Sequence, residues 1–168
     1  VEVVHLEADG RRLGAEEAIS DGVYRFMSAW NALWSNYSPA LIDFTSGFNT
    51  NRWTLSEGRY IVYRHSPGRP QASAPVGVTL YWYQNGSLIV EASRDGREWS
   101  KAGELQGNGE HEVELPEELF PADEIFVRLR STGSMQVTSY AYEARITDGT
   151  VQLRGTTVPL TIETSPPD

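Results

Sequence analysis

The sequence predicts an all-β fold, an antiparallel β-sandwich of the jelly-roll type with one short helix near its N-terminus. Several short stretches alternate between two faces with the two-residue period of a strand; residues 88–93, for example, put Leu, Val and Ala on one face and Ile, Glu and Ser on the other. Tight-turn pairs such as Asn-Gly at 85–86 and Asp-Gly at 95–96 separate these stretches. Little of the chain has helical periodicity, so two packed antiparallel sheets are expected.

The length fits one domain, and the composition excludes several classes of binding partner. The chain has 168 residues, which predicts a single domain over residues 1–164 and the start of a linker or tail at residues 165–168, Ser-Pro-Pro-Asp. The first residue is Val, which indicates a processed product or a piece of a longer chain. The formal net charge of −9 argues against nucleic acid as a partner, and no apolar run approaches the roughly 20 residues that membrane insertion needs. With no cysteine, disulfides and thiolate metal sites are excluded, while secretion stays open.

The N-terminal third has one ambiguous segment. Residues 1–6 are predicted as a first strand. From Val23 to Trp34 apolar residues recur at steps of three and four after a possible N-cap at Ser20 or Asp21, which favours a short amphipathic helix; a strand over residues 22–27 is the alternative. In either case we expect the Trp30 and Trp34 side chains to close one end of the core.

The remaining elements are predicted as strands and loops. Three prolines within residues 66–75 favour a long exposed loop, because proline removes a donor from the strand ladder. In the last long strand, Thr138 and Tyr140 are expected on the inner face and Glu143 on the outer face. The predicted strands are residues 53–55, 59–64, 76–83, 88–93, 111–115, 125–131, 137–146, 150–153 and 158–162.

One motif carries a resemblance to a known family. A strand, then Ser93-x-Asp95-Gly96-x-x-Trp99, then the later strand 125–133 resembles the C-terminal half of a discoidin-type (coagulation factor 5/8 type C-like) domain of the galactose-binding-like superfamily, over about residues 78–146. The first half departs from that pattern, since residues 44–53 lack an Asp-Gly pair leading to a Trp and are similar to the opening strand and turn of secreted jelly-roll sandwiches. A β-sandwich of another family therefore stays open.

The resemblance implies a ligand site at one tip of the sandwich, in loops such as residues 45–52 and 66–75. It also implies a structural calcium ion, since hard oxygen ligands suit calcium. In the glycan-binding members a Glu near the last core strand helps to hold the ion, and Glu143 has a similar place here, with Asp43 as a partner from an early loop. The alternative is that Glu143 is a surface residue opposite Arg145 or Arg128.

Aromatic side chains suggest a second kind of site, on a sheet face. An aromatic ring can pack on the C–H face of a pyranose while amides or guanidinium groups bind its hydroxyls. Tyr81 and Tyr83 share one face of a predicted strand and Leu80 and Trp82 the other, so one of these faces is a candidate platform. The indoles of Trp53, Trp82 and Trp99 are expected in the core. The predicted ligand-binding residues are Tyr81, Tyr83, Tyr63, Arg64, His65 and Asn85, with Tyr60 as an alternative to Tyr63.

No catalytic constellation emerges from the sequence. It has no Gly-x-Ser-x-Gly, no His-Glu-x-x-His and no phosphate-binding glycine loop, and its three histidines are far apart. We therefore predict a non-catalytic carbohydrate-binding module, an accessory domain of a larger extracellular or cell-surface protein, with a glycan or polysaccharide as partner. The alternatives are a protein-binding assembly domain of a surface appendage, capsid or phage tail, with other protein subunits as partners, and, less favoured, a glycan-degrading enzyme.

Overall fold

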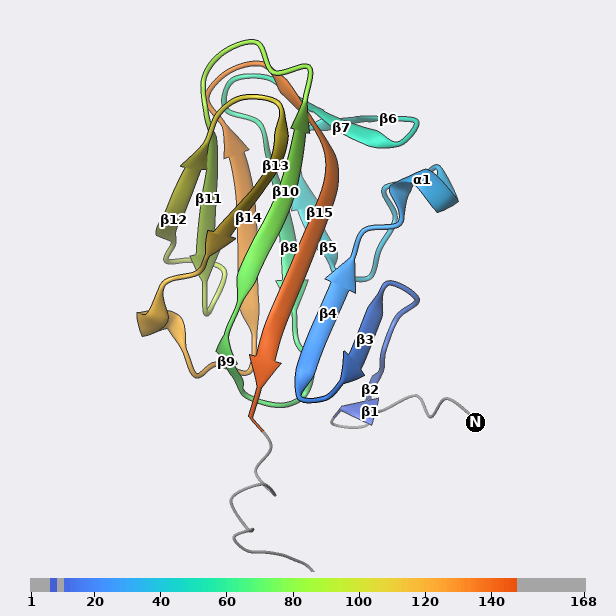
Figure 1. Cartoon of the computed structure of the whole chain (residues 1–168), viewed down its shortest axis with the longest axis vertical. Coiled ribbons are helices and arrows are strands. Elements are labelled where there is room, and N and C mark those ends of the chain that lie inside the picture. The colour runs from blue at the N-terminus through green and yellow to red at the C-terminus, as the bar shows by residue number, and fades with distance from the viewer. Residues whose placement is uncertain (1–6, 9–10, 148–168) are drawn as a thin grey trace, which may run out of the picture.

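The computed structural model describes residues 7–8 and 11–147, which form two antiparallel sheets packed face to face (Figure 1). This confirms the predicted all-β sandwich. The strands predicted at 1–6, 150–153 and 158–162 lie outside the described residues, and the predicted linker at 165–168 lies outside them too.

The front sheet in Figure 1 has eight strands, with β10 and β15 at its centre. Its main path is β13 (Gly109–Glu114), β10 (Pro75–Tyr81), β15 (Met135–Ile146), β4 (Val23–Met27) and β3 (Glu17–Ser20). Off this path, β7 (Arg52–Leu55) and β9 (Gln71–Ser73) pair with β15, and β6 (Gly47–Asn49) pairs with β7.

The rear sheet has five strands. Their order is β12 (Ser100–Leu105), β11 (Leu88–Ser93), β14 (Ile125–Ser131), β8 (Tyr60–His65) and β5 (Leu41–Phe44). The remaining elements are a small hairpin of β1 (Glu7–Ala8) and β2 (Arg11–Arg12), the helix α1 (Trp30–Leu33) and the 3-10 turn η1 (Glu117–Leu119).

The core between the sheets contains a column of stacked rings. The rings of Tyr63 and Tyr140 are parallel with centroids 4.4 Å apart, and those of His65 and Tyr142 are 3.9 Å apart. The Nε2 atom of His65 lies 2.7 Å from the hydroxyl of Tyr140, so the buried polar atoms are partnered. Tyr63 and His65 have no exposed surface. Both were predicted as ligand-binding residues, but they lie on the inner face of β8 and not on the outer face where a ligand platform was expected.

The segment predicted as a helix is mainly a strand. Residues 23–27 form β4, which pairs with β15 and places Tyr24 and Phe26 in the core, so the alternative interpretation holds there. Only four residues form α1, which ends where Trp34 adopts a left-handed conformation with φ of 53°. Trp30 is buried as expected, but Trp34 is 61% exposed, so the prediction that both indoles close the core is correct for one of them.

Two further strand predictions shift at particular residues. The strand predicted over 76–83 ends at Tyr81, because Trp82 has a left-handed backbone (φ 50°) that cannot continue the ladder. In β15 the pairing with β10 jumps from Ser139 to Val137, so Thr138 is the extra residue of a bulge and Val137 takes the inner position expected for Thr138.

The proline-rich loop is also less exposed than predicted. Within residues 66–75, Gln71 begins β9 and is fully buried, and its Nε2 donates to the carbonyl oxygens of His65 (3.1 Å) and Asp123 (3.3 Å). The loop is therefore anchored to the end of the core.

Candidate functional site

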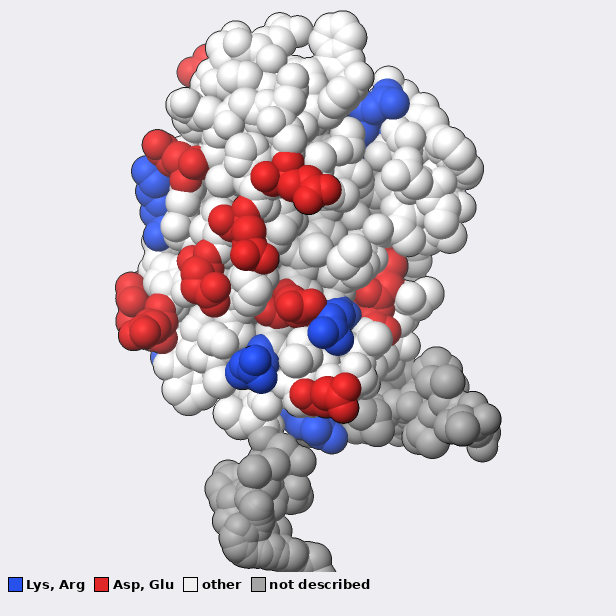
Figure 2. Space-filling view, viewed as in Figure 1, with Lys and Arg blue, Asp and Glu red and all other residues white. Residues whose placement is uncertain are grey.

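The two outer faces of the sandwich differ in charge and in aromatic content. Figure 2 looks onto the eight-stranded sheet, where Asp and Glu side chains gather. A shallow depression of about 490 Å³ on this face is lined by small or polar residues such as Gly77, Thr79 and Ala141, with Glu110 and Glu112 beside them. No aromatic side chain lines this depression apart from the imidazole of His111, so it offers no large ring to a sugar.

The outer face of the five-stranded sheet has a groove of a different composition. Its volume is about 350 Å³, which lies within the range of small-ligand sites. Aromatic rings, two arginines and two aspartates share its lining. The lining residues are Ile42, Asp43, Tyr60, Val62, Asp95, Gly96, Arg97, Trp99, Phe126 and Arg128.

The floor of the groove comes from β8 and β14, which lie side by side in the sheet. Arg128 is the cross-strand partner of Val62, and Arg130 is the partner of Tyr60. Because side chains alternate across a strand, the residues between these positions face the core, and Tyr60, Val62 and Arg128 share the outer face. The alternation predicted from the sequence for β14 is confirmed, since Val127 and Leu129 are fully buried.

One wall of the groove is the turn between β11 and β12. The Asp95 Oδ1 atom accepts hydrogen bonds from the Ser93 hydroxyl (2.9 Å), the Arg97 amide (2.8 Å) and the Glu98 amide (3.0 Å). The two backbone hydrogen bonds, from Glu98 and then Arg97, are the main cause that lowers the pKa of Asp95 to about 2. The carboxylate therefore holds the turn closed while it is ionised.

The same turn brings Trp99 back over the outer face of the sheet. Gly96 has φ of 76°, and a Cβ atom there would lie 3.3 Å from the ring of Phe126, so the turn packs closely on β14. Trp99 is half-buried, and the Cζ atom of Arg128 lies 4.2 Å from the centroid of its ring, a cation–π contact. The predicted turn is confirmed, but the expectation that Trp99 is a core residue is wrong.

Arg128 is fixed from below by Glu91 of β11. The Arg128 Nε donates to Glu91 Oε1 at 2.7 Å, and Arg130 Nη2 lies 3.2 Å from Glu91 Oε2. The Glu91 side chain is 10% exposed, against 24% for Arg128 and 38% for Arg130. Burial raises the pKa of Glu91, but the hydrogen bonds from the two arginines outweigh it, so the net pKa is lowered and Glu91 is ionised.

The opposite wall contains a tyrosine paired with a carboxylate. The Tyr60 hydroxyl donates to Asp43 Oδ2 at 2.9 Å. This hydrogen bond is the main cause that raises the pKa of Tyr60 above its usual value of 10, so its ring stays neutral over the physiological range. Tyr60, which the sequence offered only as an alternative to Tyr63, is thus in the groove.

The residues predicted as one platform are dispersed over the molecule. Tyr81, Tyr83 and Asn85 lie at or just beyond the end of β10, at one tip of the sandwich. The Tyr83 hydroxyl donates to the Gly86 carbonyl oxygen (2.6 Å), and the Asn85 Oδ1 accepts from the Ser134 amide (3.2 Å), so both stabilise the connection to β11. Arg64 is exposed on β8 and lies 3.8 Å from Glu124.

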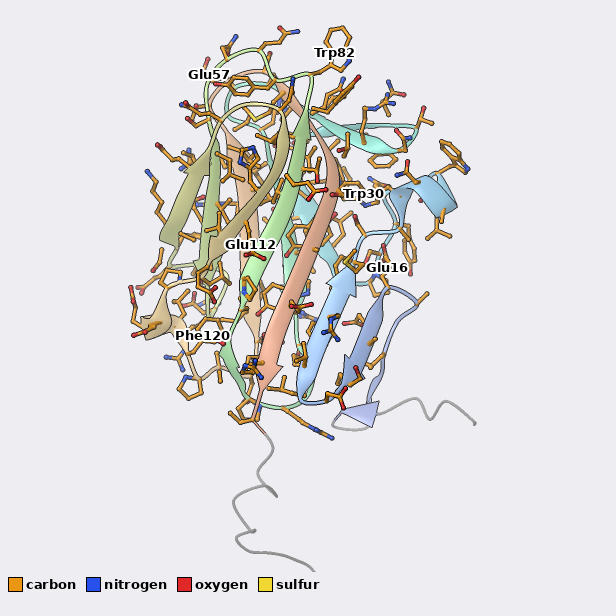
Figure 3. All side chains as sticks on the ribbon, viewed as in Figure 1. Glu16, Trp30, Glu57, Trp82, Glu112 and Phe120 are labelled. Carbon is orange, nitrogen blue, oxygen red and sulfur yellow. The ribbon has the colours of Figure 1, made fainter. Side chains whose placement is uncertain are left out.

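The tip does present two exposed rings. Tyr81 is 52% and Trp82 60% exposed, and Figure 3 shows Trp82 at the end of the sandwich away from Phe120. Trp82 lines a smaller depression of about 180 Å³ together with Thr54, Gln84 and Gln136. The expectation that Trp82 is a core residue is wrong, while Trp53 is fully buried as expected.

The two predicted calcium ligands do not meet. Glu143 forms an ion pair with Arg25 (2.6 Å) on the outer face of the eight-stranded sheet, whereas Asp43 lies on the five-stranded sheet on the opposite side. Across the part of the chain that the structure describes, no three His, Cys, Asp or Glu side chains form a cluster suited to a metal ion. Glu143 and Asp43 therefore do not fit a shared calcium site, and a structural calcium ion stays a prediction without a ligand set.

Comparisons with known proteins gave structural similarity only. No family model and no curated protein sequence matches the chain. A family GH115 4-O-methyl-α-glucuronidase with specificity for decorated arabinogalactans matches at 12% identity and a TM-score of 0.45; the match covers 74% of this chain but only 18% of the glucuronidase. CBM86, a low affinity xylan binding module from Roseburia intestinalis, matches at 11% identity over 76% of this chain and 97% of its own, with a TM-score of 0.45.

A third match is CsCBM6-3 from Clostridium stercorarium, solved in complex with cellobiose. It has 12% identity over 62% of this chain and 82% of its own, with a TM-score of 0.36. In the described residues no helix is long and apolar enough to cross a membrane. Because all three TM-scores are below 0.5, the case for a function rests on the side chains of the groove.

Proposed function

We propose that the chain is a non-catalytic carbohydrate-binding module whose binding site is the groove on the five-stranded sheet. The observation that carries the proposal is the half-buried indole of Trp99, held over an outer sheet face by Arg128 and sharing one groove with Tyr60. A flat ring that is neither in the core nor fully exposed suits packing against the apolar face of a sugar.

The polar groups around these rings suit sugar hydroxyls. The carboxylates of Asp43 and Asp95 are acceptors, and the guanidinium groups of Arg97 and Arg128 are donors, all within the same groove. A few polar groups around an apolar surface are typical of small-ligand sites, where they fix the orientation of the ligand.

Binding without hydrolysis fits the pKa of Asp95. Glycoside hydrolysis needs a carboxylic acid that is protonated near neutral pH and so has a raised pKa. Asp95 has the opposite shift, to about 2, and its Oδ1 is already occupied by three donors of its own turn. Asp95 is thus suited to holding the turn and not to donating a proton. The accessory role and the extracellular or cell-surface location belong to the same proposal.

The proposal is tested by glycan binding to two tryptophan variants. Trp99→Ala removes the ring of the groove, and Trp82→Ala removes an exposed ring at the tip as a matched control. We expect the affinity for a bound glycan, measured by isothermal titration calorimetry, to fall roughly tenfold or more in Trp99→Ala, because the ring supplies contact area and orientation. Trp82→Ala should bind as the unchanged protein does. The opposite ranking would move the site to the tip.

A protein-binding role in an assembly is the second candidate, and one surface feature favours it. Leu33, Trp34 and Tyr37 are 53%, 61% and 71% exposed and follow one another closely after the buried Trp30. Exposed apolar groups that lie close together are typical of protein contacts. Light scattering distinguishes the candidates, since an assembly domain should form a stable oligomer that Trp34→Ser and Tyr37→Ser dissociate, whereas a glycan module should be monomeric and insensitive to these changes.

A further inference from the structure

The groove has donors without acceptors, while its acceptors already have donors. The Asp43 Oδ2 atom accepts from the Tyr60 hydroxyl, and the Asp95 Oδ1 atom accepts from three groups of its own turn. Both carboxylates are therefore partly satisfied by the protein itself. A ligand gains most from this groove by supplying acceptors.

Arg128 is the donor that is best prepared for such a ligand. Its Nε is used by Glu91 and its cationic plane lies over Trp99, but its two terminal nitrogens have no hydrogen-bond partner among the described residues. The guanidinium is thus held on one edge and one face while its terminal nitrogens remain available. Two donors on a fixed planar group match the two oxygens of a carboxylate.

The charge beneath the Trp99 ring is net positive, although the two aspartates of the groove lining balance its two arginines. Glu91 carries one negative charge between Arg128 and Arg130, so this half-buried group of three keeps one net positive charge in a chain whose formal net charge is −9. Arg97 on the neighbouring turn also lines the groove, is exposed, and its side chain has no ion pair or hydrogen bond within the described part of the chain.

We propose, on the basis of the function proposed above, that the groove selects a sugar bearing a carboxylate, a hexuronic-acid unit of an acidic polysaccharide. Its carboxylate would bind the terminal nitrogens of Arg128 with Arg97 nearby, its ring would contact Trp99, and its hydroxyls would meet the Asp43 wall. Asp43 disfavours a second negative charge at that end of the groove, which orients the sugar with its carboxylate toward the arginines.

The test compares each acidic polysaccharide with its neutral counterpart. Polygalacturonate, alginate and hyaluronan are titrated by calorimetry against the whole chain, each beside a carboxyl-reduced form of the same polymer. We expect at least one of the three to bind at least tenfold more tightly than its reduced form, with an affinity that falls as salt rises. If every reduced polymer binds as well as its parent, the inference is overturned.

Three variants assign the selectivity to residues. Arg128→Gln should abolish the preference for the acidic form, and Arg128→Lys should recover part of it, because lysine keeps the charge but loses the planar pair of donors. Arg97→Gln should weaken the preference for the acidic form. Because the Arg97 side chain is exposed, such a loss could not be attributed to disturbed packing of the sheet. Lys101→Gln is the matched control: Lys101 is an exposed cation paired with Glu104 (3.0 Å), lies outside the groove lining, and its loss should leave the preference unchanged.

The outcomes also separate this inference from the proposed function. Equal binding of neutral and acidic polymers that is lost in Trp99→Ala would leave the carbohydrate-binding module standing and overturn the uronate preference. A preference for the acidic forms that survives in Arg128→Gln and Arg97→Gln would equally overturn the inference. Absence of binding to every acidic and neutral glycan would count against both.

Discussion

Replacement of Glu91 by Ala tests whether the fold depends on the carboxylate that fixes the groove. Removing one partner of a fully buried ion pair costs about 3 to 5 kcal/mol, since an uncompensated charge stays inside the protein. Here the arginines left behind are 24% and 38% exposed and can turn partly toward water. We therefore expect Glu91→Ala to lower the free energy of unfolding by about 2 kcal/mol, which corresponds to a fall in Tm of roughly 4 to 8 °C for a chain of this size.

The assay is equilibrium urea denaturation followed by tryptophan fluorescence and by circular dichroism. The matched control is Glu104→Ala, which breaks the ion pair between Glu104 and Lys101. Both of these side chains are about half exposed. An exposed pair contributes at most about 1 kcal/mol, so the control should change little. Glu91→Ala should also weaken glycan binding, because Arg128 loses the contact that holds it beneath Trp99.

Two results would refute this reasoning. If Glu91→Ala and Glu104→Ala are equally mild, burial of the Glu91 carboxylate does not contribute to stability as argued. If the triple replacement of Glu91 by Leu and of Arg128 and Arg130 by Met is no more stable than Glu91→Ala, the cost does not come from unpaired charges, since apolar groups of similar volume should remove it.

Three further predictions concern the turns and the core. The stability that Asp95 contributes should be complete above its ordinary pKa of 3.8 and lost as the pH falls toward about 2. The difference in Tm between the unchanged protein and Asp95→Asn should therefore narrow between pH 4 and pH 2. A constant difference would contradict the lowered pKa. Gly86→Ala would place a Cβ 2.6 Å from the Gly133 backbone and should cost about 1 to 3 kcal/mol more in urea unfolding than Gly58→Ala, which has a similar φ but open space around it; equal costs would contradict the close approach. Tyr142→Phe should lower Tm by a few degrees because the buried side-chain oxygen of Gln71 loses its donor, and an unchanged Tm would argue against that hydrogen bond.

The sheets could be predicted from the sequence where one local signal decided the structure. Alternation fixed β14 and β11, and the Asp95-Gly96 turn followed from residues that tolerate and stabilise it. The helix prediction failed over residues 23–27, where four of the five residues are apolar. Val23, Phe26 and Met27 fit the helical period, but Tyr24 and Phe26 equally fit one face of a strand. These residues form a strand because they pair with β15, a segment more than a hundred residues away in the sequence.

The candidate site was harder to predict because alternation does not say which face is covered. On β8, Tyr63 and His65 share one face, and Tyr60 and Arg64 share the other. Only the packing of the second sheet identifies the face with Tyr63 and His65 as the core face. The prediction of Tyr63, Arg64 and His65 as ligand-binding residues combined both faces of β8, because Arg64 alternates with the other two. An available signal was Arg128 at an outward position of β14, since a charged residue marks the face that is not the core.

Trp99 shows why the fold and the groove depend on the same few residues. Its large apolar ring predicted a core position, but the three hydrogen bonds to Asp95 and the close approach of Gly96 to Phe126 force the chain to return on the outer side of the sheet. There Arg128 covers one face of the indole, and Glu91 holds Arg128 in place. A substitution that loosens the turn should consequently weaken ligand binding strongly and lower Tm only slightly, since the core contacts between the sheets do not include Trp99.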